Sequence, residues 1–165
     1  MGLFNTRDRR KLLLATKLYK KHAYMSALYY LKPLWVANRI ELLGHLIAEC
    51  YRRSGDYCHA HDNYKDLTIL FPKGTYASLA QTLEKRLAPI NPLRVKCQKL
   101  QMKACTTLRT IFKKELKDGY HAGGTGVAEV DLYLGNATKA KRSLLGLCKQ
   151  GYLRACSALG WPHHK

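Results

Sequence analysis

The stretch SGDYCHAHDNYKDLTILFP, residues 54–72, contains three side chains of types that bind metals, namely Cys58, His59 and His61. Cys58 and His61 are three residues apart, which would place them on one side of a helix, and Cys50 could add a third ligand. A structural zinc site needs four ligands in two close pairs, and the second pair is missing here. We therefore predict no metal. We expect His59 to face solvent, His61 to be partly buried and Cys58 to pack in the core.

The six cysteines form three pairs with one spacing, seven residues lying between the members of each pair: Cys50/Cys58, Cys97/Cys105 and Cys148/Cys156. Residues eight apart in one helix are about 12 Å apart along its axis, too far for a disulfide. The first and third pairs flank turns and could face each other across hairpins. Cys97/Cys105 lies in an uninterrupted helical pattern and could not. We expect buried free thiols, with a small secreted protein held by disulfides as the alternative.

No pattern of catalytic residues is apparent. The glycine-rich GGTGV at residues 123–127 lacks both the Lys-Ser/Thr of a phosphate-binding loop and a preceding strand. Paired carboxylates, a Ser-His-Asp set and a Cys-His arrangement are also not evident. We expect a non-catalytic protein without cofactor or small-molecule substrate, in which the glycine-rich segment is a flexible connector.

The charge balance is the strongest feature of the composition. The chain has 29 Lys and Arg against 11 Asp and Glu, a formal net charge of +18 at pH 7. No acidic residue occurs between Asp8 and Glu41, between Glu84 and Glu115, or after Asp131. Such a field favours a polyanionic partner, most simply nucleic acid. An anionic membrane or an acidic protein is the alternative.

Residues 92–117 read as one long amphipathic helix. Its apolar side would contain Leu93, Cys97, Leu100, Ala104, Leu108 and Ile111. Six lysines share the opposite side: Lys96, Lys99, Lys103, Lys113, Lys114 and Lys117. This single-sign stripe, roughly 35 Å long, suits the regular charge of a phosphate backbone. Further nucleic-acid-binding candidates are Arg52, Arg53, Lys139, Lys141 and Arg142.

The N-terminal sequence has features of a targeting segment. It lacks the apolar core of a secretory signal but matches the myristoylation pattern at Gly2 and Thr6, followed by a basic cluster. Its basic, acid-poor composition also suits a mitochondrial import signal. No apolar run is long enough for a transmembrane helix. We expect the mitochondrial matrix as the location, with the cytoplasm as the alternative.

The elements that must position these residues are helices, because glycine and proline are sparse and no alternating strand pattern occurs. The expected helices are 8–21, 23–32, 34–53, 57–70, 75–87, 92–117, 126–134, 137–149 and 152–159. Pro33 is expected to end the second of them. Residues 118–126, with four glycines, are expected to be flexible.

Eight residues follow the spacing of a helical repeat: Ala27, Ala48, Tyr51, Gly55, Tyr57, Ala60, Tyr64 and Pro72. In this pattern small alanines let two antiparallel helices approach, aromatic rings fill the groove, glycine turns and proline stops. The pattern resembles the tetratricopeptide (TPR) repeat, with Gly44 where that family has tryptophan, and fits best over residues 41–74. The resemblance implies a right-handed solenoid of antiparallel hairpins that docks other proteins. The same region resembles the RNA-binding pentatricopeptide repeat more weakly.

We therefore predict an all-α, TPR-like array. Residues 1–90 would form two hairpins and a following helix, and residues 91–165 the basic helix and a degenerate hairpin, packed as one continuous array. The expected function is that of a subunit or adaptor of a large ribonucleoprotein, with an organellar (mitochondrial) ribosome as the best assignment. It would contact rRNA phosphates and neighbouring proteins. The alternative is a docking module for an acidic protein segment or anionic membrane, as an accessory subunit of another complex.

Overall fold

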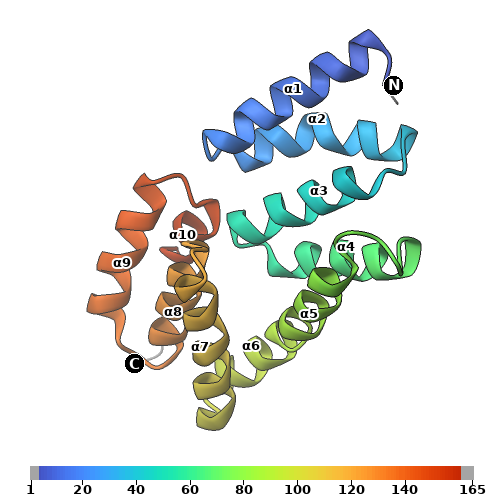
Figure 1. Cartoon of the computed structure of the whole chain (residues 1–165). Coiled ribbons are helices and arrows are strands. Elements are labelled where there is room, and N and C mark those ends of the chain that lie inside the picture. Colours follow the sequence, from blue (N-terminus) through green and yellow to red (C-terminus); the bar gives the residue numbers. More distant parts are fainter. Residues whose placement is uncertain (1–3, 161–165) are drawn as a thin grey trace. The chain divides into compact units, whose positions relative to one another are not determined.

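The computed structural model describes residues 4–160, and this part of the chain is helical throughout, without a strand (Figure 1). Its helices, in order, are α1 (Thr6–Lys20), α2 (Tyr24–Ala37), α3 (Glu41–Ser54), α4 (Tyr57–Leu70), α5 (Ala77–Leu87), α6 (Ile90–Gln98), α7 (Met102–Lys117), α8 (Ala122–Tyr133), α9 (Ala137–Lys149) and α10 (Leu153–Ala158). The predicted all-α fold and its helical-repeat character are confirmed. Gly2 of the myristoylation pattern lies outside the described residues.

The chain forms two compact units. Unit 1 comprises residues 1–52 and 59–85, and unit 2 comprises residues 53–58 and 86–165. Each unit has its own buried apolar residues.

In unit 1, α1 packs on α2, and α2 runs through Pro33 rather than ending there. The expected break is therefore wrong. Proline removes one backbone donor from a helix interior and crowds the preceding turn. Here Leu31, Leu34 and Trp35 are buried around Pro33, which is itself exposed. Their burial holds the helix together across the proline, and the chain leaves it only after Ala37.

Gly44 on α3, at the position where the predicted repeat pattern would have a tryptophan, is tightly packed. A Cβ atom at Gly44 would lie 2.7 Å from Leu67 and 3.0 Å from the ring of Trp35. Trp35 comes from the preceding helix and is buried against Phe71 at 6.3 Å between ring centroids. The indole that fills this space thus comes from α2 instead of α3.

In unit 2, successive helices are joined by one kind of turn. Each of the four turns that join α6 to α10 has a residue with positive φ: Leu100 (60°), Gly119 (91°), Gly135 (84°) and Gly151 (97°). In each case the next residue's N–H donates to the carbonyl five residues earlier, as Gln101 does to Lys96 and Tyr120 to Glu115. This is the Schellman ending of a helix, which satisfies its last carbonyls and reverses the chain. Helices α6 to α10 therefore pack each on the next.

The turn at Leu100 shows that the predicted long helix over residues 92–117 is wrong. The chain reverses between α6 and α7, so the first two lysines of the stripe lie before the turn and the other four lie after it. The six lysines consequently do not follow one rod.

The glycine-rich segment is a helix, so the expected flexible connector is also wrong. Helix α8 begins at Ala122 and is buried over most of its length. A Cβ atom at Gly126 would lie 2.3 Å from the Phe112 ring, and one at Gly123 would lie 2.5 Å from the Phe112 carbonyl oxygen. These glycines are needed because α7 and α8 approach so closely, not because the segment must bend.

Within the described residues, no helix combines the length and the apolar character needed to cross a membrane.

Candidate polyanion-binding surface

Glu129 on α8 lies in a buried cluster of charges in unit 2. Its side chain has no exposed area and accepts a hydrogen bond from Nε of Arg94 at 3.1 Å. Arg154 also donates to this carboxylate. The two arginines come from α6 and α10, so Glu129 ties three helices together. Removing one partner of such a buried pair costs about 3–5 kcal/mol, because the other charge stays buried and uncompensated.

The charge of Glu129 also affects the titration of its neighbours. Burial alone would lower the pKa of Arg154, but its hydrogen bonds and charge attraction to Glu129 outweigh burial and raise that pKa. Burial raises the pKa of Tyr133, and the negative charge of Glu129 raises it further. Both groups therefore stay protonated at neutral pH, and the Tyr133 hydroxyl accepts a hydrogen bond from Gln98 at 3.2 Å.

The other acidic residues of α7 and α8 also form internal ion pairs. Glu115 is fully buried and pairs with Arg86 at 3.2 Å, and Asp131 is nearly buried and pairs with Arg109 at 3.2 Å. Asp118 is more exposed and contacts Arg86 at 3.0 Å. Desolvation would raise the pKa of Asp118, but the hydrogen bond and charge of Lys114, together with Arg86, outweigh it and lower that pKa.

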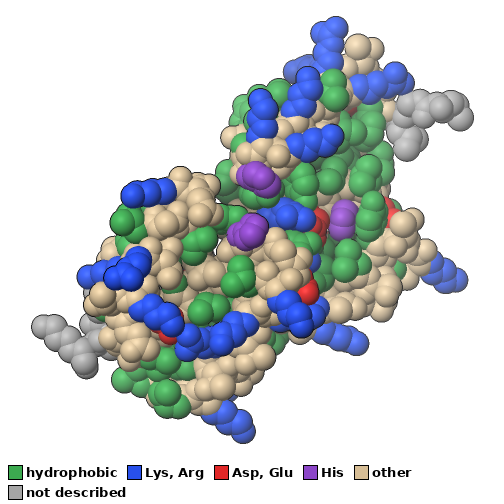
Figure 2. All heavy atoms as spheres, turned by 60° about the vertical axis from the view of Figure 1, so that its left-hand side comes forward, with side chains coloured by type: hydrophobic (Ala, Val, Ile, Leu, Met, Phe, Trp, Pro, Cys, Tyr) green, Lys and Arg blue, Asp and Glu red, His purple; other side chains and the backbone are tan. Residues whose placement is uncertain are grey.

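Because its acidic side chains point inward or are paired, unit 2 presents an almost purely cationic surface. Among its described acidic residues, Asp118 is the exposed one, and it is already held by two cations. Its exposed basic residues are Lys96, Lys99, Lys103, Lys113, Lys114, Lys117, Lys139, Lys141, Arg142 and Lys149. Figure 2 shows Lys and Arg side chains spread over the visible face, with few Asp and Glu between them.

The structure thus exposes nine of the predicted nucleic-acid-binding residues, on three helices and one turn of unit 2. The other two differ. Arg52 is 3% exposed and lies 3.6 Å from the carboxylate of Glu49, so its assignment to a surface patch is wrong. Arg53 is half-buried, with its guanidinium 4.6 Å from the centroid of the Tyr120 ring. It contributes to packing through a cation–π contact.

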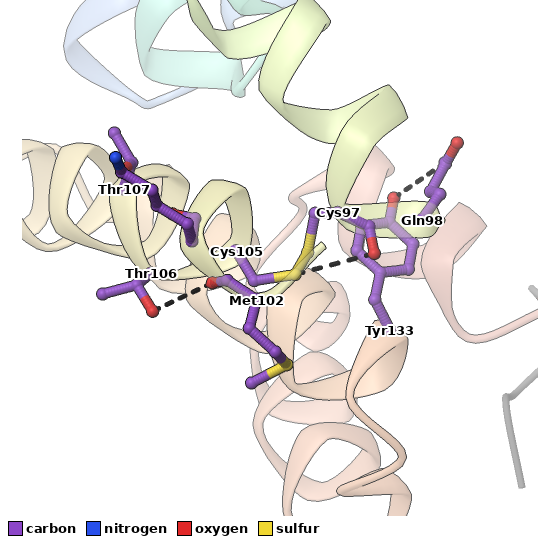
Figure 3. The surroundings of a disulfide bond; sticks show 8 residues. Cys97, Gln98, Met102, Cys105, Thr106, Thr107 and Tyr133 are labelled. Carbon is purple, nitrogen blue, oxygen red and sulfur yellow. Dashed lines mark hydrogen bonds between the residues drawn. A yellow bond between two sulfur atoms is a disulfide. The ribbon is translucent and has the colours of Figure 1, made fainter. Parts of the chain in front are cut away.

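Two of the three cysteine pairs form disulfides, Cys97–Cys105 and Cys148–Cys156. The expectation that Cys97 could not reach Cys105 is wrong, because the turn at Leu100 brings the end of α6 beside the start of α7. Figure 3 shows this bond, with Cys105 also near the Cys97 carbonyl and Gln98 reaching Tyr133 of α8. The first disulfide closes a hairpin with exposed lysines on both sides of its turn, and the second closes a hairpin whose exposed lysines lie on α9.

Around the Cys-His-Ala-His stretch, the described residues contain no group of three side chains placed to hold a metal ion. His59 is exposed, and His61 is partly buried with Nε2 at 3.2 Å from Glu84. Cys58, which was expected in the core, is exposed. It lies on the outer side of α4 because Tyr57 and Ala60 occupy the buried positions next to it.

The residues predicted to pack the repeat are placed as follows. Seven of the eight are buried: Ala27, Ala48, Tyr51, Gly55, Tyr57, Ala60 and Tyr64. Tyr64 donates from its hydroxyl to Glu49 at 2.5 Å, so its buried polar atom is satisfied. Gly55 has φ 87°, and exposed Pro72 follows the end of α4.

His45 in unit 1 packs in a partly buried position on α3. Its ring stacks on Tyr76 at 3.9 Å between centroids, and its Nδ1 atom is buried without a hydrogen-bond partner. Burial lowers its pKa, although the charges of Glu49 and Glu41 act in the opposite direction. The neutral imidazole is therefore favoured, and its role is packing.

Sequence reasoning missed the residues that make the surface cationic, namely the inward-facing pairs around Arg94, Glu129 and Arg154. Lys149 was also omitted from the candidates. A signal existed for the pairs, since Glu129 and Asp131 are surrounded by apolar residues in the sequence.

Comparison with protein-family models, with curated proteins and with solved structures gives no match for this chain.

Proposed function

We propose that the chain is a non-catalytic, basic helical-repeat subunit or adaptor of a ribonucleoprotein, in which unit 2 contacts RNA phosphates. The observation that supports this most is the separation of charge within unit 2. Its buried or paired acids leave ten exposed cations with one exposed carboxylate, that of Asp118, among the described residues.

A surface of this kind is unusual for a face that only meets solvent. Exposed helix faces normally mix signs, because opposite charges three or four residues apart stabilise the helix. Among the described residues, the lysines of α7 form one ion pair of this spacing with an exposed acid, between Lys114 and Asp118 at 3.2 Å. The remaining lysines repel one another, and a phosphate backbone relieves this repulsion while releasing counterions.

The TPR-like spacing in α3 and α4 supports the adaptor part of the proposal. Repeats of that type hold segments of other proteins, so neighbouring subunits would be held by unit 1 while unit 2 meets RNA. More specifically, we propose that the ribonucleoprotein is an organellar ribosome and that the chain contacts its rRNA.

The two disulfides bear on where such a subunit could work. Disulfides persist in oxidising compartments, whereas the mitochondrial matrix and the cytoplasm keep thiols reduced. A location in the matrix therefore requires these four cysteines to be reduced in the cell. Alkylation of free thiols before lysis, followed by mass spectrometry, tests this point.

The second candidate is a docking module for an acidic protein or an anionic membrane. It is favoured by exposed apolar side chains that lie among the cations, such as Leu100 and Met102, which gain nothing from phosphates.

The proposal is tested by purifying the tagged chain at low salt, with and without nuclease. We expect RNA to co-purify with the chain at low salt and to be lost when the salt concentration is raised. Nuclease treatment should remove the RNA together with the proteins bound through it. Partners retained unchanged after nuclease, with no RNA bound, would contradict it and favour the docking module.

A further inference from the structure

The turn between α6 and α7 has an unusual residue at its tip. Leu100 has φ 60°, a conformation that glycine adopts freely and that places the Cβ of other residues close to backbone atoms. The equivalent residues of the other turns in unit 2 are Gly119, Gly135 and Gly151. Leucine is therefore strained where its neighbours are not, and strain of this kind is retained when the side chain has another use.

Packing of the Leu100 side chain does not compensate for this backbone strain, since 51% of the residue is exposed. Two more apolar residues of the same hairpin are equally open, Val95 at 51% and Met102 at 59%. In Figure 3 Met102 extends away from the disulfide. The hairpin tip thus presents three aliphatic side chains to solvent.

Three exposed cations directly neighbour these aliphatic residues in the sequence. Lys96, Lys99 and Lys103 are exposed, and no acidic residue lies between Glu84 and Glu115 in the sequence. The Cys97–Cys105 disulfide joins the two helices directly behind the tip. The shape of the apolar tip is therefore fixed in advance, which reduces the entropy lost when it binds.

We propose that the α6–α7 tip, consisting of Val95, Leu100, Met102 and the three lysines, inserts into the surface of an anionic lipid bilayer. Aliphatic side chains enter the boundary between headgroups and acyl chains, and lysines extend their charged ends to the lipid phosphates. RNA fits these residues less well, since its bases stack on aromatic rings and arginine planes. The inference deepens the second candidate function, the module that docks on an anionic membrane, and does not rest on the ribonucleoprotein proposal.

The test uses the full oxidised chain with two kinds of vesicle, one of phosphatidylcholine alone and one that also contains phosphatidylglycerol. Co-sedimentation measures binding of the parent and of the double variant Leu100→Gly with Met102→Ser. Glycine relieves the strain at position 100, so this variant keeps the turn. We expect the parent to bind the anionic vesicles and the variant to bind them about tenfold more weakly, a difference of about 1.4 kcal/mol.

The matched control is Leu145→Ser with Leu153→Ser. These leucines of unit 2 are 48% and 61% exposed but lie outside the tip, so binding should stay at the parent's level. RNA retention is measured for all three proteins and should not change. Equal vesicle binding by parent and tip variant would overturn the proposal. A tip variant that loses RNA retention but keeps vesicle binding would overturn the proposal too, and would identify RNA as the ligand of the tip.

Discussion

The hairpins α6–α7 and α7–α8 turn in the same way but are closed by different means. In both, a residue with positive φ follows the helix, and the next N–H bonds back to the carbonyl five residues earlier. In α6–α7 a disulfide then joins the two helices. In α7–α8, Gly123 and Gly126 lie so close to Phe112 that no side chain fits between the helices.

The position of the turn residue determines what can bridge such a hairpin. In α6–α7 the bridged cysteines are three residues before and five residues after Leu100, and in α9–α10 they have the same offsets from Gly151. The corresponding positions around Gly119 are Leu116 and Gly124. One turn geometry therefore serves both a covalent and a non-covalent closure.

The largest expected effect comes from breaking the non-covalent closure. Gly126→Ala should lower the free energy of unfolding by about 3 kcal/mol, because the added methyl group would overlap the Phe112 ring and force α7 and α8 apart. Urea denaturation followed by circular dichroism measures this. The matched control is Gly146→Ala on α9, where a Cβ atom meets nothing within 4 Å. That change should stabilise the chain by about 0.5–1 kcal/mol. Equal effects of the two changes would refute the glycine closure.

Removing a covalent closure should have the next largest effect. Replacing Cys97 and Cys105 by serine should cost about 2–3 kcal/mol, the loop-closure value for a short bridge, and so should replacing Cys148 and Cys156. Cys58→Ser, at an exposed cysteine, should have no measurable effect.

Alkylation of the denatured chain without reductant provides an independent check on these bridges. Two of the six cysteines should react without reductant, and all six should react after reduction. Reaction of all six in unreduced protein purified under oxidising conditions would contradict both bridges.

The smallest expected effect concerns the two turn residues of the disulfide-closed hairpins. Leu100→Gly should stabilise the chain by about 1 kcal/mol, since it relieves a positive φ at a non-glycine residue, and Gly151→Leu should destabilise it by about as much. Opposite shifts of the urea midpoint are the expected result. Shifts of the same sign would show that the two turns are not equivalent.

The sequence was sufficient to predict the helical class, because its apolar periodicity is helical and several of its helix breaks contain glycine, as at Gly55, Gly119 and Gly151. It did not reveal the turn inside residues 92–117, where Lys99, Leu100 and Gln101 carry no turn signal. The glycines of α8 were misread for the opposite reason, since a close approach of two helices requires glycine as much as a loop does.

The cysteine pairs show the same limit of sequence reasoning. All three have one spacing, yet Gly55 lies five residues after Cys50, whereas Leu100 and Gly151 lie three residues after their first cysteine. The spacing is therefore not sufficient without the position of the turn. Likewise, the excess of basic residues was evident from composition, but its exposure depends on pairs such as Arg94–Glu129 that link residues distant in sequence.

The most direct test of the account is the salt dependence of RNA binding in two variants of equal net charge. One replaces Lys139, Lys141 and Arg142 of unit 2, which lie outside the α6–α7 tip, by glutamine, and the other replaces the exposed Lys65, Lys73 and Lys85 of unit 1 by glutamine. Filter binding of single-stranded RNA at several salt concentrations gives the slope of log K against log salt. We predict that the unit 2 variant loses affinity for RNA and that its slope becomes shallower by about two, while the unit 1 variant keeps the parent's slope. Identical slopes for the two variants would contradict this prediction.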